Sequence, residues 1–364
     1  MVLTAFWQQA LAADPPAPKP KSPPPTEIVL VTPGDINAEK AAAWKKEGFK
    51  GVAMVLDDAV EAGACLRTAK AISTKGLELY YWIEVARQPA LAEAHPKWMA
   101  SLGIHQDWQD RYPNVVPPQE GEVAKAFPWV SIGYQEAFDA HLERVSALLK
   151  RAAPNFRGVL LNDLQGGPSS CGCGNSQCRW AIDYHVESTA TKVEADDAAA
   201  RFVSAVRQRV AGKAVVPIWT TECEEEDLPS KKRTNAFTTG YCGTVSCAHG
   251  LCPKDFTKQW SALAKESGDA IGLLSLHREF KRARKEYGEG PAWVVRSVGY
   301  LDKELPQHGG VPFPHQKLWL VVQGATKDEE LAARRVAAQT GAGTVIVARA
   351  KLDQSYEPRV IPVK

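Results

Sequence analysis

The sequence predicts an α/β protein folded as a single (β/α)8 barrel. Eight apolar runs rich in β-branched residues recur along the chain, and a helix-like segment follows nearly every one. Most of these runs end on a polar or acidic residue. Because barrels of this class place their chemistry at the carboxyl ends of the strands, we search for functional residues there. The predicted strands are residues 28–32, 51–58, 77–84, 158–163, 214–222, 271–277, 318–323 and 344–349.

The first half of the chain supplies four strands and three helices. Asn37 is a suitable cap for a helix that extends to Gly48, and a second helix ends near Lys75, with Gly76 after it. Residues 86–132, which contain several aromatic side chains, predict an ordered loop over the mouth of the barrel. A helix over 134–152 then leads into the fourth strand.

The second half continues the same alternation. Long Gly- and Cys-rich loops follow the fourth and fifth strands, and helices are predicted over 195–210, 256–266, 293–303 and 328–339. Alternation within the strands is weak, as expected when both faces are buried. A doubly wound sheet is the competing architecture. It needs fewer strands, and no G-x-G-x-x-G pattern opens a first helix here.

Composition limits the classes of partner. The 364 residues carry a formal net charge of +2, and Lys and Arg are spread along the chain. This pattern does not predict a nucleic-acid partner. No apolar stretch approaches the ~20 residues of a membrane span.

The N-terminal segment suggests export. Residues 2–13 are mostly apolar and contain the A-x-A pattern at Ala10–Ala12, although a basic region before them is missing. A Pro-rich linker follows up to Pro25. We therefore expect a signal-like segment and linker over 1–25, a barrel domain over 26–364, and a secreted or periplasmic location. The alternative for the N-terminus is a disordered tail.

Three carboxylates at strand ends are the catalytic candidates. Asp163 ends the fourth predicted strand, Glu222 the fifth and Glu84 the third. Neighbouring strands lie ~4.8 Å apart, so these groups can face one another across a glycosidic bond. We expect Asp163 to be nucleophile or base, Glu222 the general acid, and Glu84 an orienting or alternate carboxylate. Alternatively, such acids only cap the next helix.

Aromatic and polar residues near the same strand ends are the candidates for substrate binding. An indole offers a flat face for a sugar ring, and Trp82 and Trp219 lie just before Glu84 and Glu222. The alternative is that such tryptophans fill the core. The remaining candidates, chosen for their places after the strands, are Asn162, Gln165, His277, Gln323, Asp57 and Arg349.

Seven of the eight cysteines lie in the two long loops. Disulfides that join these loops are one explanation in an oxidising compartment, and a structural zinc site is the other. The spacing lacks the paired C-x2-C pattern that marks zinc sites. We expect the eighth, Cys65, to be a buried free thiol on a helix. The seven loop cysteines are Cys171, Cys173, Cys178, Cys223, Cys242, Cys247 and Cys252.

Four segments resemble secreted bacterial glycoside-hydrolase-like TIM-barrel proteins, a largely uncharacterised family. They are WIEV…HPKW (82–98), LLNDLQGG with CGCGNSQCRW (160–180), WTTECEE (219–225) and LDQSYEPR (352–359). The resemblance implies a barrel and a carbohydrate substrate. Retaining barrel glycosidases often have Asn-Glu at the end of strand 4 and Glu at the end of strand 7. Here Asn162-Asp163 and Gln323 stand there, which favours a pairing between strands 4 and 5.

The leading hypothesis is an exported glycoside hydrolase acting on an oligo- or polysaccharide, with no cofactor. The first alternative is a non-catalytic barrel that binds a glycan or a protein. The second is a metal-dependent hydrolase with Asp57, Asp58, Asp163 and His277 as ligands.

Overall fold

The structure is a computed structural model of the whole chain, and its described part consists of the following residues. They are 23–101, 109, 112–130, 132–164, 198–210, 212–219, 253–266 (253–259 as backbone only), 270–276, 294–295, 298–299, 301–302, 306, 309–310, 312–352 and 356–363.

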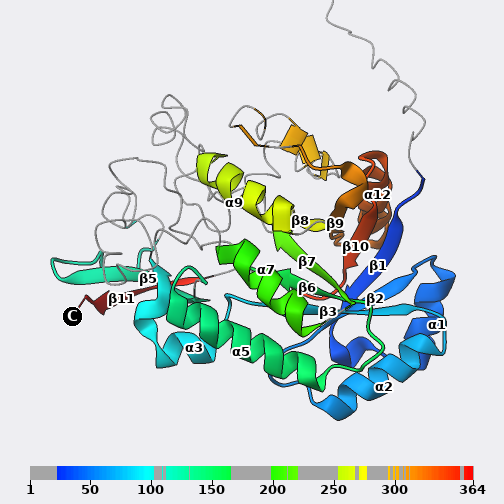
Figure 1. Ribbon diagram of the computed structural model, residues 1–364, viewed down its shortest axis with the longest axis horizontal. Coiled ribbons are helices and arrows are strands. Elements are labelled where there is room, and N and C mark those ends of the chain that lie inside the picture. The colour runs from blue at the N-terminus through cyan, green and yellow to red at the C-terminus, as the bar shows by residue number, and fades with distance from the viewer. Residues whose placement is uncertain are drawn as a thin grey trace, which may run out of the picture.

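Eight parallel strands close into a barrel, as the sequence predicts. Around the ring the order is β1-β10-β9-β8-β7-β6-β3-β2, and every neighbouring pair is parallel. Figure 1 shows the ring with helices outside it. The strands are β1 (Thr26–Val31), β2 (Gly51–Val55), β3 (Glu78–Glu84), β6 (Gly158–Asn162), β7 (Ala214–Trp219), β8 (Ile271–Ser275), β9 (Leu318–Val322) and β10 (Thr344–Ala348).

The helices also follow the predicted alternation. The Asn37 side chain caps α1 by accepting a hydrogen bond from Lys40 N at 2.8 Å, and the Thr326 hydroxyl caps α12 by accepting one from Glu329 N. The longest helix, α5, covers β3 and β6 from outside (Figure 1). The helices are α1 (Ala38–Lys46), α2 (Ala62–Ser73), α5 (Gln135–Arg151), α7 (Ala198–Arg209), α9 (Pro253–Glu266) and α12 (Lys327–Gln339).

Side chains alternate between the barrel interior and the layer of helices. On β3, Tyr80 and Trp82 belong to the interior cluster, whereas Tyr81 and Ile83 belong to the outer cluster under the helices. Gly51 leaves room for the Tyr80 ring, since a Cβ at Gly51 would lie 3.0 Å from it. The alternation therefore fixes which residues at the strand ends point into the mouth of the barrel.

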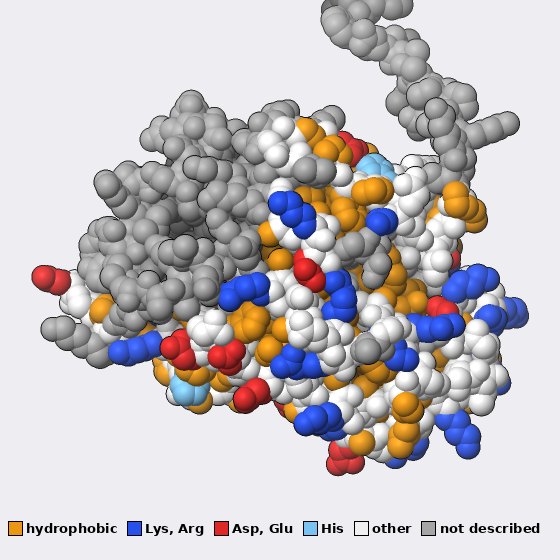
Figure 2. All heavy atoms as spheres, viewed as in Figure 1, with side chains coloured by type: hydrophobic (Ala, Val, Ile, Leu, Met, Phe, Trp, Pro, Cys, Tyr) orange, Lys and Arg blue, Asp and Glu red, His pale blue; other side chains and the backbone are white. Residues whose placement is uncertain are grey.

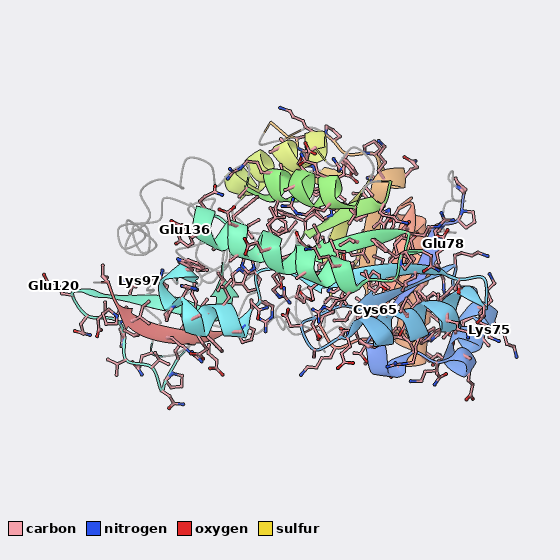
Figure 3. All side chains as sticks on the ribbon, turned by 60° about the horizontal axis from the view of Figure 1, so that its bottom comes forward. Cys65, Lys75, Glu78, Lys97, Glu120 and Glu136 are labelled. Carbon is pink, nitrogen blue, oxygen red and sulfur yellow. The ribbon has the colours of Figure 1, made fainter. Side chains whose placement is uncertain are left out.

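A second, three-stranded sheet lies beside the barrel, and the sequence analysis missed it. Residues 86–132, predicted as a loop, form α3 (Pro89–Ala94), the short helix η2 (Pro96–Trp98), β4 (Met99–Ser101) and β5 (Glu122–Val130). The C-terminal strand β11 (Glu357–Pro362) pairs antiparallel with β5. We call β11, β5 and β4 the accessory sheet; it projects to one side of the barrel (Figure 3).

The accessory sheet is joined to the barrel just after β3. Val130 N donates to Ala86 O at 2.8 Å, and Gln88 N donates to Pro128 O at 3.1 Å. The Tyr112 and Tyr356 hydroxyls also form a hydrogen bond, at 2.7 Å. The sheet thus fixes the chain that leaves the carboxyl end of β3.

On the face shown in Figure 2, Lys and Arg side chains are spread among apolar and acidic ones. Within the described residues, no helix is long and apolar enough to cross a membrane.

His141 on α5 is fully buried against the accessory sheet. Its Nε2–H donates to Val130 O at 2.9 Å, and its Nδ1 has no hydrogen-bond partner among the described residues. Burial disfavours the charged imidazolium and lowers the pKa of His141 from 6.5 to about 4.

We expect this neutral histidine to make the fold acid-sensitive. The unfolded chain takes up the proton first, so the free energy of unfolding should fall as the pH drops from 6.5 to about 4. The His141 contribution is on the order of 3 kcal/mol over that range. Urea unfolding at several pH values measures it. His141→Gln should flatten this part of the profile, and His95→Gln, at an exposed position, should not. An unchanged profile in His141→Gln contradicts the assignment.

Candidate active site

Glu84 and Asn162 are adjacent at the carboxyl ends of two neighbouring barrel strands. They are direct register partners in the β3–β6 pair, and Val85 N donates to Asn162 O at 3.0 Å. The preceding inward-facing residues on these strands, Trp82 and Leu160, are in the interior cluster. By alternation, Glu84 and Asn162 therefore face the mouth of the barrel.

One amide nitrogen joins two of the predicted catalytic carboxylates. Asn162 Nδ2 donates to Glu84 Oε2 at 2.8 Å and to Asp163 Oδ1 at 3.2 Å. The other Glu84 oxygen, Oε1, accepts a hydrogen bond from the Trp82 indole N–H at 2.8 Å. Glu84 thus accepts N–H groups on both oxygens, which fixes the orientation of this carboxylate. We call Trp82, Glu84, Asn162 and Asp163 the carboxylate cluster.

The backbone at Asp163 has an unusual conformation. Its φ is 61°, and within the described residues it is the only non-glycine residue with a positive φ. Aspartate enters this region at a modest cost, and such residues gather at functional sites. Asp163 is also 5% exposed. The turn after β6 therefore holds this carboxylate under the surface beside Asn162.

The spacing of the two carboxylates bears on their chemistry. Since Glu84 Oε2 and Asp163 Oδ1 both contact one nitrogen, at 2.8 and 3.2 Å, they are at most about 6 Å apart. Retaining glycosidases hold their carboxyl groups at ~5–5.5 Å, and inverting enzymes at ~6.5–9.5 Å. The cluster is therefore closer to the retaining arrangement.

Gln323 extends the mouth on the opposite side of the barrel. It follows β9, where Val321 faces the interior and Val322 faces the helices, so alternation directs Gln323 inward. Its Oε1 is buried and has no hydrogen-bond partner within the described residues. A buried acceptor without a donor is costly, so this atom suits a ligand hydroxyl, and the predicted role stays a prediction.

The acids after β2 are used in local structure. Asp57 Oδ1 accepts a hydrogen bond from Ala59 N at 3.0 Å and so stabilises the turn. Asp58 Oδ2 accepts hydrogen bonds from Arg144 Nε at 2.7 Å and from Gln88 Nε2 at 2.9 Å. Partial burial favours the neutral form of Asp58, but these hydrogen bonds and the positive charges of Arg144 and Arg151 outweigh it and lower its pKa.

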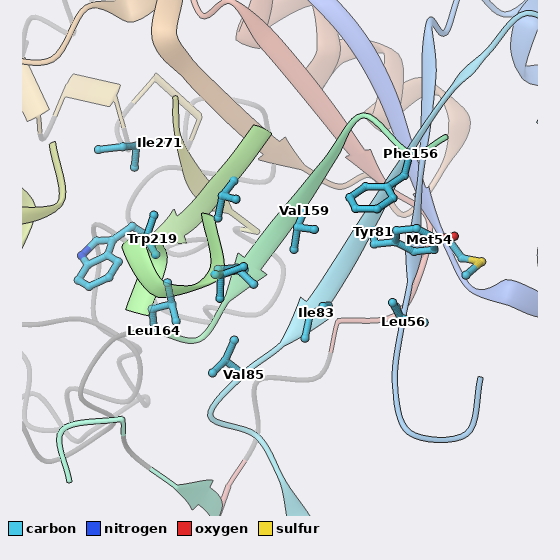
Figure 4. Close-up of a cluster of buried hydrophobic side chains, with 14 of the residues drawn as sticks. Met54, Leu56, Tyr81, Ile83, Val85, Phe156, Val159, Leu164, Trp219 and Ile271 are labelled. Carbon is cyan, nitrogen blue, oxygen red and sulfur yellow. The ribbon is translucent and has the colours of Figure 1, made fainter. Parts of the chain in front are cut away.

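Neither tryptophan offers a face for stacking on a sugar, which corrects the prediction. Trp82 is fully buried in the barrel interior, where its N–H holds Glu84. Trp219 is also fully buried, in the outer cluster. Figure 4 shows it among other residues of that cluster, including Leu164 and Ile271. Strand alternation directs the Trp219 indole away from the mouth.

Arg349, predicted to bind substrate, contacts structural residues in the part of the chain that the structure describes, and its predicted role stays a prediction. Position 349 follows an inward-facing Ala348, so its side chain enters the layer between the barrel and the helices. There the guanidinium binds Glu330 of α12, with Nε–Oε2 at 2.9 Å, and Glu47. It also lies over the Phe49 ring. These contacts raise the pKa of Arg349 above its usual value, chiefly through the hydrogen bond to Glu330.

Several predicted residues lie outside the described residues: Gln165, Glu222, His277 and the seven loop cysteines, Cys171, Cys173, Cys178, Cys223, Cys242, Cys247 and Cys252. Cys65 is confirmed as a buried free thiol on α2. In the part of the chain that the structure describes, no group of three or more His, Cys, Asp or Glu side chains is placed to hold a metal ion.

Two residues that the sequence did not predict, Arg144 and Gln88, support the cluster from outside. Arg144 and Gln88 both bind Asp58, and Arg144 Nη1 also donates to Glu84 O at 2.9 Å. Arg144 is 86 residues from Asp58 along the chain. No spacing rule connects residues so far apart, so only the three-dimensional structure identifies this contact.

Comparisons with known proteins identify no family. No protein-family model and no curated protein matches the chain. A solved GH36 α-galactosidase from Geobacillus stearothermophilus, in complex with raffinose, aligns with a TM-score of 0.41 and 13% identity, over 90% of this chain and 39% of that one. A β-galactosidase from the psychrophilic Marinomonas ef1 gives 0.46 and 11%, over 88% and 53%.

A solved citrate synthase also aligns, with a TM-score of 0.35 and 9% identity, over 90% of this chain and 86% of that one. This chain spans about two fifths of the length of the GH36 α-galactosidase and about half of the length of the β-galactosidase. All three TM-scores are low and the proteins catalyse different reactions. The functional argument therefore rests on the side chains of this chain.

Arg349→Met tests the structural role of Arg349. Removing the guanidinium leaves Glu47 and Glu330 without this partner, so we expect the free energy of unfolding to fall by roughly 1–3 kcal/mol. Thermal and urea unfolding measure the loss. Lys351→Met, at an exposed position nearby, should change stability little. Unchanged stability in Arg349→Met contradicts a structural role.

Proposed function

We propose that this chain is a carbohydrate-active glycoside hydrolase that works through Glu84 and Asp163. The single observation that carries the proposal is the pair of carboxylates held on one amide, Asn162 Nδ2, at the carboxyl end of the barrel. Closely spaced carboxyl groups in that position are what glycosidic bond cleavage requires. An oligo- or polysaccharide is the substrate class, and the apolar N-terminal segment supports a secreted or periplasmic location.

The geometry suggests a division of roles. Glu84 accepts N–H groups from Trp82 and Asn162, which hold both of its oxygens in a fixed orientation, as a nucleophile requires. It would attack the anomeric carbon as the glycosidic bond breaks, while Asp163 gives its proton to the leaving oxygen. Asp163 then removes a proton from water, which attacks the glycosyl–Glu84 ester and restores both groups.

A second role assignment follows from the sequence alone. In it, Asp163 is the nucleophile and Glu222 the general acid, with Glu84 as an orienting carboxylate. The two assignments differ in which variant keeps partial activity. A general acid can be dispensed with when the leaving group is good, whereas a nucleophile cannot.

Amide variants of the two carboxylates test the proposal on a panel of glycans and aryl glycosides. We expect Glu84→Gln to abolish turnover, by ~10³-fold or more, on every substrate that the native chain cleaves. Asp163→Asn should lose activity on glycans but keep a substantial part of it on aryl glycosides with good leaving groups. The opposite pattern would favour the Asp163–Glu222 assignment.

Glu78→Gln is the matched control because Glu78 lies at the other end of the same strand, where it binds the Tyr80 hydroxyl and Arg157. Figure 3 shows Glu78 at the far side of the barrel from Glu136. This variant should keep its activity.

Two outcomes with the native chain would favour the other functions. Binding of a glycan without turnover would indicate a non-catalytic barrel, and loss of activity on chelation would indicate a metal-dependent hydrolase.

The carboxylate spacing predicts the stereochemistry. Because Glu84 and Asp163 are too close to admit a water between them and the sugar, the product should first appear with the anomeric configuration of the substrate. Proton NMR of the anomeric signals during the first minutes of hydrolysis measures this. First release of the inverted anomer would contradict the proposed pairing.

A further inference from the structure

The peptide group after Glu84 is held on both sides. Its N–H, on Val85, donates to Asn162 O of the neighbouring strand, and its carbonyl, on Glu84, accepts from Arg144 Nη1 at 2.9 Å. This peptide group directly carries the residue that we propose as nucleophile. Its orientation therefore sets where the Glu84 carboxylate points.

Arg144 takes the place of a missing rung in the β2–β3 ladder. The rung from Leu56 N to Trp82 O is present, at 2.8 Å. In a parallel ladder the next rung falls two residues further along, from the Asp58 N–H to Glu84 O. The chain turns away after Asp57, two residues beyond the end of β2, and the Asp57 side chain stabilises this turn. The carbonyl of Glu84 binds the guanidinium of Arg144 instead.

Asp58 and α5 hold that guanidinium in place. Arg144 Nε donates to Asp58 Oδ2 at 2.7 Å, and the Arg144 side chain is only 15% exposed. Gln88, on the segment after β3, donates to the same Asp58 oxygen. Two turns further along α5, Arg151 Nη1 donates to Asp58 O and Val60 O, at 3.1 and 2.9 Å. The Arg144 guanidinium and the Asp58 loop that binds it are thus both held in place.

We infer that Arg144, held by Asp58, is a positioning residue for the Glu84 carboxylate. The inference rests on the proposed function for its kinetic consequence, but the contact itself can be tested without a substrate. Arg144 binds the main chain of Glu84, outside the mouth, and does not reach the reacting atoms. Its loss should therefore lower kcat more than it raises KM.

Arg144→Lys and Arg144→Gln are the test variants. Lysine keeps the charge and the apolar stem, but one ammonium lacks the planar fork that serves Asp58 and Glu84 together. The matched control is Lys150→Gln, which removes a positive charge at an exposed position of the same helix. On a glycan that the native chain cleaves, both Arg144 variants should lower kcat by about tenfold to a hundredfold with KM nearly unchanged.

A substrate-independent measurement separates this inference from the proposed function. The Trp82 indole N–H binds Glu84 Oε1, so its NMR signal reports the position of that carboxylate. Trp82→Phe identifies the signal among those of the 11 tryptophans. Arg144→Lys should shift it clearly, and Lys150→Gln should leave it in place.

The outcomes are distinct. If no glycan is cleaved but the Trp82 signal moves in the Arg144 variants alone, the proposed function fails and the positioning contact stands. If glycans are cleaved but the Arg144 variants match Lys150→Gln in kcat and in the Trp82 signal, the inference is overturned. A kcat loss that disappears once each variant is assayed well below its melting temperature also overturns it.

Discussion

One amide group, Asn162 Nδ2, donates to two carboxylates at the mouth of the barrel, and the arrangement of the candidate site depends on it. Two carboxylates this close repel each other, and a donor between them offsets part of that cost. The amide can do so because β3 and β6 are neighbours in register, which brings Glu84 and Asn162 side by side. The site therefore depends on the β3–β6 register, because a shift of one residue would separate Glu84 from Asn162.

The two carboxylates are held by three different elements. Trp82 on β3 binds the Glu84 side chain, the left-handed turn after β6 places Asp163, and Arg144 on α5 binds the Glu84 main chain. Each support belongs to a different element, and the accessory sheet fixes the chain that follows Glu84. Such rigid support matters for a hydrolase because the reacting carboxyl groups must stay within a narrow range of separations.

Much of the fold could be predicted from the sequence, because each strand and each helix carries its own local pattern. The eight apolar runs and the Asn37 cap required no knowledge of distant contacts. The accessory sheet could not be found this way, since β11 pairs with a strand more than two hundred residues earlier. In the site, Glu84, Asn162 and Asp163 could be predicted because each stands at or just after the end of a predicted strand. The inward or outward direction of Trp219 and Arg349 required the register, and Arg144 required the packing of α5.

Covalent trapping tests the central claim most directly. Retaining glycosidases form a glycosyl–enzyme ester, and a 2-deoxy-2-fluoro glycosyl fluoride of the preferred sugar slows its breakdown enough for peptide mass spectrometry. The account predicts a single adduct on Glu84, with none in Glu84→Gln. An adduct on Asp163 or Glu222, or turnover of the substrate with no adduct on Glu84, would contradict it.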